Sequence, residues 1–275
     1  MAGHLFAVSD LHCSHDENWQ IIESLRPQSE DDWLIVAGDV AHSFDNIEKV
    51  LRLLKQRYAA VIWTPGNHEL WTTKDDPIQL RGAVRYRALV QMCRNNHVLT
   101  PEDEYAVWPG SNGPVTIVPL FQLYDHSWLA PGATTKKESF ERAVRTGVIC
   151  ADEVMLHSDP YPDRESWCDA RIKESERRLL ALGSEVKTVL VSHWPLVRQV
   201  TDPLRYPEFV RWCGTTRTAY WHKRFNAEVV VYGHLHIPRT THYDGVRFEE
   251  VSLGYPREWT KRSRPPVVPK KVFPA

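Results

Sequence analysis

The sequence lacks long hydrophobic runs, and this absence limits where the protein can work. No stretch approaches the ~20 consecutive apolar residues that a membrane-spanning helix needs. Asp10 and His12 interrupt the apolar run near the N-terminus after a few residues, so a secretory signal is not expected either. We therefore expect a soluble protein of the cytoplasm that has no membrane partner.

A CxxC pair and a large net charge of either sign are also missing. The five cysteines are an odd number, are widely scattered and include no CxxC pair of the kind that holds structural zinc. Reduced thiols in a cytosolic compartment are the natural interpretation. The formal net charge of −1 at pH 7 provides no overall field for recruiting nucleic acid, so nucleic acid is not the expected partner.

The sequence does contain five short segments that each follow an apolar, strand-like run and carry metal-binding side chains. They are Asp10-Leu11-His12, Gly38-Asp39, Gly66-Asn67-His68-Glu69, Ser192-His193 and Gly233-His234-Leu235-His236. The preceding runs cover residues 5–8, 34–37, 60–63, 188–191 and 229–232. Five strand ends that deliver Asp, Asn and His to one place would build a two-metal site.

Strand and helix patterns alternate over the first hundred residues, with helices expected over 17–25, 46–58 and 79–95. This alternation predicts a mostly parallel sheet. A hairpin over 239–243 and 246–252 is expected to turn at Asp244-Gly245. We expect a single α/β domain over 1–255 and an irregular, solvated tail over 256–275.

The middle stretch, residues 121–185, differs in character from the rest of the chain. It is rich in charged and aromatic residues and carries none of the motif side chains. Helices are expected over 137–150 and 164–182. We therefore expect this stretch to form a helical cap over the site, although a subunit contact and the oligomeric state stay open.

The residue types explain what such a site would bind. Alternate side chains of an extended segment share a face, so Asp10 and His12 should point the same way, as should His234 and His236. Asp39 stands alone at its strand end, and its two carboxylate oxygens suit a bridge between two cations. Two divalent cations bring four positive charges, and the two aspartates return only two negative charges. The net positive site favours an anionic substrate, above all a phosphate ester.

The motif order DxH, GD, GNHE, SH and GHLH resembles the calcineurin-like metallophosphoesterase superfamily over residues 10–236. The resemblance implies a four-layer α/β/β/α sandwich with a binuclear metal centre. It implies that one metal is held by Asp10, His12, Asp39 and His236, and the other by Asp39, Asn67, His193 and His234. A hydroxide between the metals would attack phosphorus, His68 would assist the leaving group, and Glu69 would tune the imidazole of His68.

Two differences from better-known branches of the superfamily narrow the choice of branch. The protein phosphatases of the superfamily carry GDxVDRG, whereas this chain reads GDVAHSF from Gly38 and lacks the arginine, so a protein phosphatase is not expected. Purple acid phosphatases place a tyrosine ligand three residues after the bridging aspartate, where this chain has His42. A ferric-tyrosinate centre is therefore disfavoured, and two divalent ions of Mn, Fe or Zn are expected.

The substrate is less defined than the chemistry. Four ring-bearing side chains near the motifs are candidates for substrate contact, namely His42, Trp71, Tyr124 and Trp194. The expected cap favours a phosphomonoesterase that acts on a small phosphorylated metabolite. A phosphodiesterase acting on a cyclic nucleotide or nucleic acid would use the same metals with a different rim. A catalytically silent binding scaffold is least favoured, because no ligand position of the pattern is missing.

Overall fold

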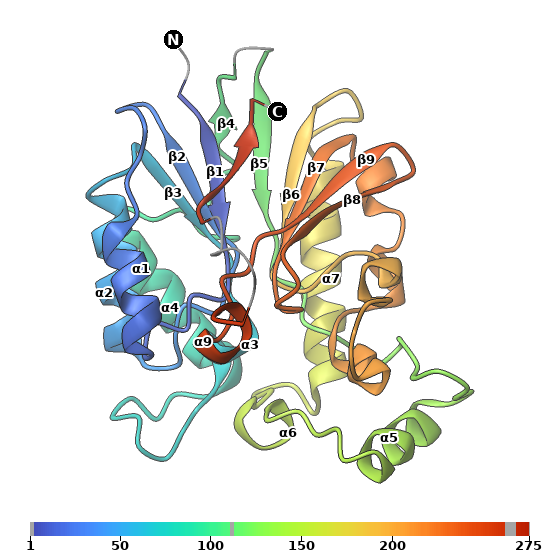
Figure 1. Ribbon diagram of the computed structural model, residues 1–275. Coiled ribbons are helices and arrows are strands. Elements are labelled where there is room, and N and C mark those ends of the chain that lie inside the picture. Colours follow the sequence, from blue (N-terminus) through green and yellow to red (C-terminus); the bar gives the residue numbers. More distant parts are fainter. Residues whose placement is uncertain (1–2, 111–112, 262–267, 275) are drawn as a thin grey trace.

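Two β-sheets lie face to face between outer layers of helices in the computed structural model, which describes residues 3–110, 113–261 and 268–274 (Figure 1). The first sheet has the order β10-β1-β2-β3 and contains β1 (Leu5–Val8), β2 (Trp33–Val36), β3 (Ala60–Trp63) and β10 (Lys270–Phe273). The second has the order β4-β5-β6-β7-β9-β8 and contains β4 (Val107–Trp108), β5 (Val115–Pro119), β6 (Thr188–Val191), β7 (Ala227–Tyr232), β8 (Arg239–Tyr243) and β9 (Val246–Glu250).

The helices form the two outer layers and the edge at which the strands end (Figure 1). The first sheet is covered by α1 (Asp16–Ser24), α2 (Phe44–Lys55) and α4 (Gly82–Asn95), and the second by α7 (Arg164–Leu180) and α8 (Trp221–Arg224). Short helices at the strand ends are α3 (Asn67–Leu70), α6 (Asp152–Met155) and α9 (Pro256–Trp259), with α5 (Lys136–Arg145) beyond them. Among the described residues, none of the helices combines the length and apolar character that crossing a membrane requires.

Strand alternation produces the four layers. Leu5 and Ala7 of β1 belong to the apolar core between the two sheets, whereas Phe6 and Val8 belong to the core that packs under the helices. The second sheet repeats this pattern, because Val189 points between the sheets and neighbouring residues of β6 alternate with it. The predicted α/β/β/α sandwich is confirmed.

The middle stretch divides into two parts. α7 is part of an outer layer, since its Trp167, Ile172 and Leu179 are buried in the apolar core. α5 and α6 lie instead at the end of the molecule where the strands of both sheets finish (Figure 1). Only this second part is placed to cover a site, so a cap made of α5 and α6 stays a prediction.

Residues 256–275 differ from the irregular tail that we expected. Pro256 is the first residue of α9. β10 pairs antiparallel with β1, and Phe273 lies opposite Leu5. Val272 is fully buried between the sheets. Both elements have only four residues, and β10 depends on pairing with a strand from the other end of the chain, so local periodicity does not reveal them. Residues 262–267 and 275 of this tail lie outside the described residues.

Candidate metal centre

The five motifs meet at one edge of the sandwich because each follows the carboxyl end of a parallel strand. β1, β2 and β3 run parallel in the first sheet, and β6 and β7 run parallel in the second. A parallel bridge between Ser9 and Ser252 joins the two sheets next to the first motif. Sequence segments that are far apart therefore deliver their polar side chains to the same place, as the strand ends predicted.

Left-handed backbone turns aim the side chains, which differs from the extended geometry we expected. Five of the non-glycine motif residues have positive φ, namely Asp10 (53°), His12 (40°), Asp39 (54°), His234 (70°) and His236 (54°). A non-glycine residue in this region costs about 1–2 kcal/mol. Strain of this kind concentrates at functional sites, where the surrounding structure holds it in place. Asp10 and His12 do converge, but successive tight turns after β1 bring them together.

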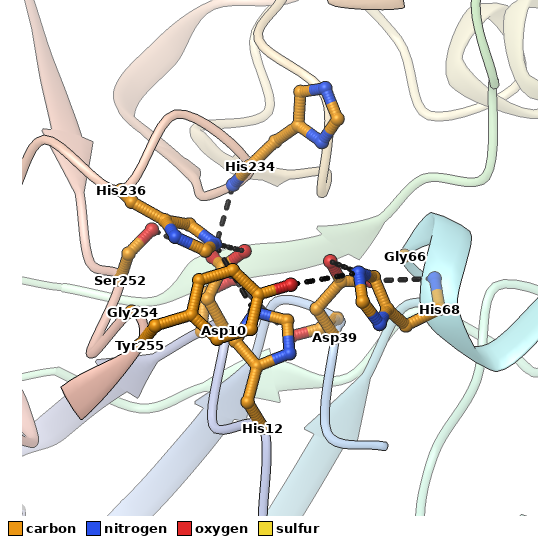
Figure 2. Close-up of polar contacts among 12 residues, drawn as sticks. Asp10, His12, Asp39, Gly66, His68, His234, His236, Ser252, Gly254 and Tyr255 are labelled. Carbon is orange, nitrogen blue, oxygen red and sulfur yellow. Dashed lines mark hydrogen bonds and ion pairs between the residues drawn. The ribbon is translucent and has the colours of Figure 1, made fainter. Parts of the chain in front are cut away.

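The first cluster joins the DxH motif to the last histidine. His236 Nε2 lies 3.0 Å from Asp10 Oδ1 and 3.2 Å from His12 Nε2. Ligand atoms of these three residues all lie within 4.8 Å of one another. Figure 2 shows the three side chains facing each other beside Asp39. Spacings of about 3 Å between donor atoms are those of neighbouring ligands around one cation with bonds of about 2.0–2.2 Å.

The second cluster is centred on His193. Its Nε2 lies 3.1 Å from Asn67 Oδ1, 3.2 Å from His234 Nδ1 and 3.4 Å from Asp39 Oδ2. Asp39 also forms a group with His12 and His68. Asp39 therefore lies between the two clusters, in the position that a bridging carboxylate requires.

Hydrogen bonding shows that this donor set suits a cation. The other nitrogen of His193, Nδ1, lies 2.9 Å from the carbonyl oxygen of Ala37, which can only accept, so Nδ1 carries a hydrogen. In the neutral imidazole, Nε2 is then a bare lone pair that faces the oxygens of Asn67 and Asp39. Burial lowers the pKa of His193, but the Asp39 and Asp10 carboxylates outweigh it and raise that pKa to about 9. The cluster thus requires a positive charge, from a proton or from a metal.

Hydroxyl and amide groups orient the Asp10 carboxylate. Its Oδ2 accepts hydrogen bonds from Ser9 Oγ at 2.6 Å, Ser252 Oγ at 2.7 Å and the backbone N–H of His234 at 3.0 Å. Burial alone would raise the pKa of Asp10, but His236 and His193 hold it below its usual range. The carboxylate stays ionised, and its other oxygen, Oδ1, is left facing the first cluster.

Glu69 does not tune His68 as we expected. Its carboxylate instead accepts hydrogen bonds from the backbone N–H groups of Asp39 at 2.9 Å, Val40 at 2.7 Å and Gly66 at 2.9 Å. Burial and the neighbouring Asp39 carboxylate raise the pKa of Glu69 to about 7. Glu69 therefore ties the GD loop to the GNHE loop and fixes the position of Asp39.

His68 lies beside the two clusters, where a leaving-group acid is expected. Its backbone N–H donates to Asp39 Oδ1 at 2.9 Å, and its ring packs on Trp71 with centroids 3.7 Å apart. The Nε2 atom lies 3.8 Å from Asp39 Oδ2 and 3.4 Å from the hydroxyl of Tyr255 (Figure 2). Burial lowers the pKa of His68 to about 4. The ring is held rigidly with one nitrogen directed at the metal-binding space.

The four candidates for substrate contact divide into two pairs. His42 and Trp71 are half-buried, and their ring centroids lie 6.2 Å apart beside His68. Tyr124 and Trp194 are fully buried instead. Trp194 packs against His193 with centroids 5.1 Å apart, and the Tyr124 hydroxyl donates to Asp152 at 3.0 Å. The structure places this second pair in the core behind the site, where they support it and offer no surface to a substrate.

Sequence reasoning missed three residues that contact the motif side chains. Tyr255 stacks on His12 with centroids 4.3 Å apart and an interplanar angle of 17°. Glu258 accepts a hydrogen bond from His236 Nδ1 at 2.7 Å. Asp152 accepts hydrogen bonds from the Asn67 amide at 3.0 Å and the Trp71 indole at 2.6 Å. Proline at the start of α9 followed by Glu258 is a helix-start signal that could have marked the second of these.

The chain belongs to the calcineurin-like phosphoesterase family, whose pattern it matches over residues 3–238. A curated relative, the acyl-carrier-protein phosphodiesterase PptH of Mycobacterium tuberculosis, is 56% identical over 258 residues, which cover 94% of this chain and 80% of the relative. The crystal structure of phosphopantetheinyl hydrolase (PptH) from M. tuberculosis matches with a TM-score of 0.95 and 54% identity, covering 99% of this chain and 96% of that chain.

These likenesses confirm the predicted superfamily and the prediction of a metal-dependent phosphoester hydrolase. They change the expected reaction, because the relative is a phosphodiesterase and not a phosphomonoesterase. The phosphodiesterase alternative is therefore better supported than the monoesterase. The relative is named for an acyl carrier protein, which is neither a small metabolite, a cyclic nucleotide nor a nucleic acid.

Proposed function

We propose that this protein is a metal-dependent phosphodiesterase that removes the phosphopantetheine arm from a carrier protein. The observation that carries the proposal is 56% identity to an acyl-carrier-protein phosphodiesterase over 94% of the chain. The site supports hydrolysis of a phosphate ester, because two clusters of ligand atoms share Asp39 and their carboxylates favour a bound cation. A diester of phosphoric acid carries one negative charge and complements such a site.

Seven residues would hold two divalent ions of Mn, Fe or Zn. The first would lie among Asp10, His12, Asp39 and His236, and the second among Asp39, Asn67, His193 and His234. When bound, the ions would supply positive charge to the phosphate oxygens and make a water molecule more acidic. The choice among the three metals is not determined by nitrogen and oxygen donors of this kind.

The chain's own residues orient the ester and manage the proton. In hydrolysis a water oxygen forms a bond to phosphorus. The bond between phosphorus and the oxygen of the carrier-protein serine that bears the arm breaks, and this serine oxygen receives a proton. His68 Nε2 is the nitrogen placed to hold that proton, since its ring is fixed by Trp71 and its backbone by Asp39. The bound phosphate anion favours the protonated imidazole and offsets the effect of burial on the pKa of His68.

The test compares three phosphate esters. The enzyme, with and without added Mn²⁺, is given a phosphopantetheinylated carrier protein, bis-p-nitrophenyl phosphate and p-nitrophenyl phosphate. We expect the carrier protein to lose its arm, as seen by intact-protein mass, and the bis ester to react faster than the monoester. Fast monoester hydrolysis with an intact carrier protein would overturn the proposal.

Two variants give this assay its controls. His68→Ala should keep its metals and lose activity by about 10²-fold or more, because general acid catalysis contributes 10²–10⁴-fold. His97→Asn is the matched control, since His97 is exposed beyond the end of α4 and its φ of 57° is one that asparagine tolerates. It should behave as the wild type.

A further inference from the structure

A groove with a volume of about 660 Å³ opens beside the candidate metal centre. Three stretches of chain line it, within residues 42–46, 72–81 and 154–157. Its volume lies in the range of about 300–1,000 Å³ that is common for small-molecule sites. None of the motif residues lines the groove, so it is a separate space that adjoins the centre.

His42 connects the groove to the centre. It lines the groove, and its ring centroid lies 6.0 Å from that of His68 and 6.2 Å from that of Trp71. A substrate whose phosphate lies at the metals and whose chain passes the ring of His42 would enter the groove. The groove is thus on the path of one of the two arms of a phosphodiester.

A buried arginine makes the groove and the centre one rigid unit. Arg85 is fully buried and donates to the backbone oxygen of Glu69 at 2.7 Å and of His42 at 2.5 Å. It also pairs with Asp76 in the groove at 3.1 Å. Since each bond constrains a different stretch, the groove wall is fixed relative to α3 without a ligand.

α6 forms another part of the groove wall and is held by backbone contacts. The backbone N–H of Thr72 donates to the oxygen of Met155 at 3.0 Å, and Trp71 pairs with Leu156 in an isolated antiparallel bridge. Val154 lines the groove and is 76% exposed, so its side chain is available at the surface. This wall is the part of the middle stretch that lies at the site end of the molecule (Figure 1).

The lining suits a neutral chain with amide groups. The lining contains hydroxyl and amide side chains such as Thr72 and Gln79 and apolar ones such as Val154. Its charged side chains are Lys74, Arg81 and Asp75, together with Asp76, which is paired with Arg85. Among the described residues that line the groove, none is Phe, Tyr or Trp. A nucleotide base would require an aromatic stacking surface, so the groove fits it poorly.

We propose that this groove binds the pantetheine arm of the substrate, with the phosphate at the metal clusters and the oxygen of the carrier-protein serine at His68 Nε2. This inference rests on the proposed function and adds the location of the arm. Pantetheine carries two amides on a flexible, uncharged chain, and its amides can be matched by the hydroxyl and amide groups of the lining. The preformed walls reduce the entropy lost when such a chain is ordered.

The test fills the groove without touching the centre. Val154→Trp places a large ring at the groove, and Val144→Trp makes the same change on α5, where Val144 is 49% exposed and outside the lining. Both variants are assayed with the phosphopantetheinylated carrier protein, with the p-nitrophenyl phosphodiester of pantetheine and with bis-p-nitrophenyl phosphate. Circular dichroism verifies that both are folded.

We expect Val154→Trp to lower kcat/KM at least about tenfold on both pantetheine diesters, chiefly through KM, and to leave bis-p-nitrophenyl phosphate unaffected, while Val144→Trp changes nothing. A loss confined to the carrier protein would overturn the inference, because the small diester has no protein to dock. Unchanged activity of Val154→Trp on both pantetheine diesters would also overturn the inference. If the wild type cleaves the bis ester but neither pantetheine diester, the proposed function fails, and the inference fails with it.

Discussion

The carboxylate of Asp152 accepts a hydrogen bond from the side-chain amide of Asn67 at 3.0 Å. A carboxylate without a proton can only accept, so the amide must present its NH₂ group to Asp152 and its oxygen to His193, 3.1 Å away. Asp152 thus determines which atom of Asn67 faces the second cluster. It comes from α6, 85 positions further along the chain.

Asp152→Ala should therefore weaken metal binding at the second cluster while the fold persists. Outer residues that orient metal ligands typically contribute 10–100-fold in affinity, and we expect a loss in that range. Metal content after dialysis at defined free Mn²⁺ measures it. Asp244→Asn is the control, because Asp244 lies in the β8–β9 turn at a φ of 52° that asparagine tolerates. Full retention of both metals by Asp152→Ala would contradict this role.

The strands and the motif positions could be predicted because their signals are local. β1, β3 and β6 begin and end where the apolar runs do, and a polar motif begins within three residues of the end of each run. The glycine of the GNHE motif has a steric reason that the sequence does not record, since a Cβ atom on Gly66 would lie 2.1 Å from Asp39 Oδ1. The loop packs too closely on Asp39 for any side chain at that position.

The residues around the ligands could not be predicted, because their contacts join distant segments. Tyr255 reaches His68 across 187 positions and Asp152 reaches Asn67 across 85, and no periodicity records such a pairing. The left-handed conformations of Asp10 and His12 were missed for a different reason. Alternation describes strands, and β1 has already ended at Val8.

Tyr255 should contribute to turnover through its hydroxyl and to metal binding through its ring. Tyr255→Phe keeps the stacking on His12 but removes the hydroxyl 3.4 Å from His68 Nε2. We expect unchanged metal content and about a tenfold or greater loss of kcat on bis-p-nitrophenyl phosphate, since hydrogen bonds to charged groups contribute about 1.5–3 kcal/mol. Tyr255→Ala should also lose metal.

The control for this pair is Tyr220→Phe, at a tyrosine that is 72% exposed. Steady-state kinetics and metal content are measured on the same preparations. Equal kcat values for wild type and Tyr255→Phe would show that the hydroxyl has no part in the reaction.

Glu258 makes the C-terminal segment part of the first cluster. It accepts from His236 Nδ1 at 2.7 Å, which leaves Nε2 of that ring to face Asp10. Glu258→Gln should lower metal affinity by about 10–100-fold, because the ring loses the charged partner that increases its basicity. Glu208→Gln is a control in a 3-10 helix away from this contact. Deleting residues 256–275 should be more harmful than either variant, since it also removes β10 and its pairing with β1.

Metal binding should release protons near neutral pH. Burial lowers the pKa of His193 and His236, but neighbouring carboxylates outweigh it, raising the first to about 9 and the second well above its usual value. Both imidazoles are therefore protonated in the metal-free protein at pH 7, whereas a metal ligand must be neutral. Metal affinity should rise with pH, by about tenfold per pH unit for each proton released, and the contribution of His193 should level off above about pH 9.

Calorimetry of Mn²⁺ binding at pH 7 in two buffers with different ionisation enthalpies counts the protons directly. For each protein molecule that fills its site, we expect the observed heats to differ by at least the difference between the ionisation enthalpies of the two buffers, which corresponds to one released proton. His222→Gln is the control for a histidine away from the clusters, because His222 is a buried residue of α8 that pairs with Asp244. Its proton count should equal that of the wild type. Identical heats in the two buffers would mean that His193 and His236 are already neutral, and that the carboxylates do not impose positive charge on the empty clusters.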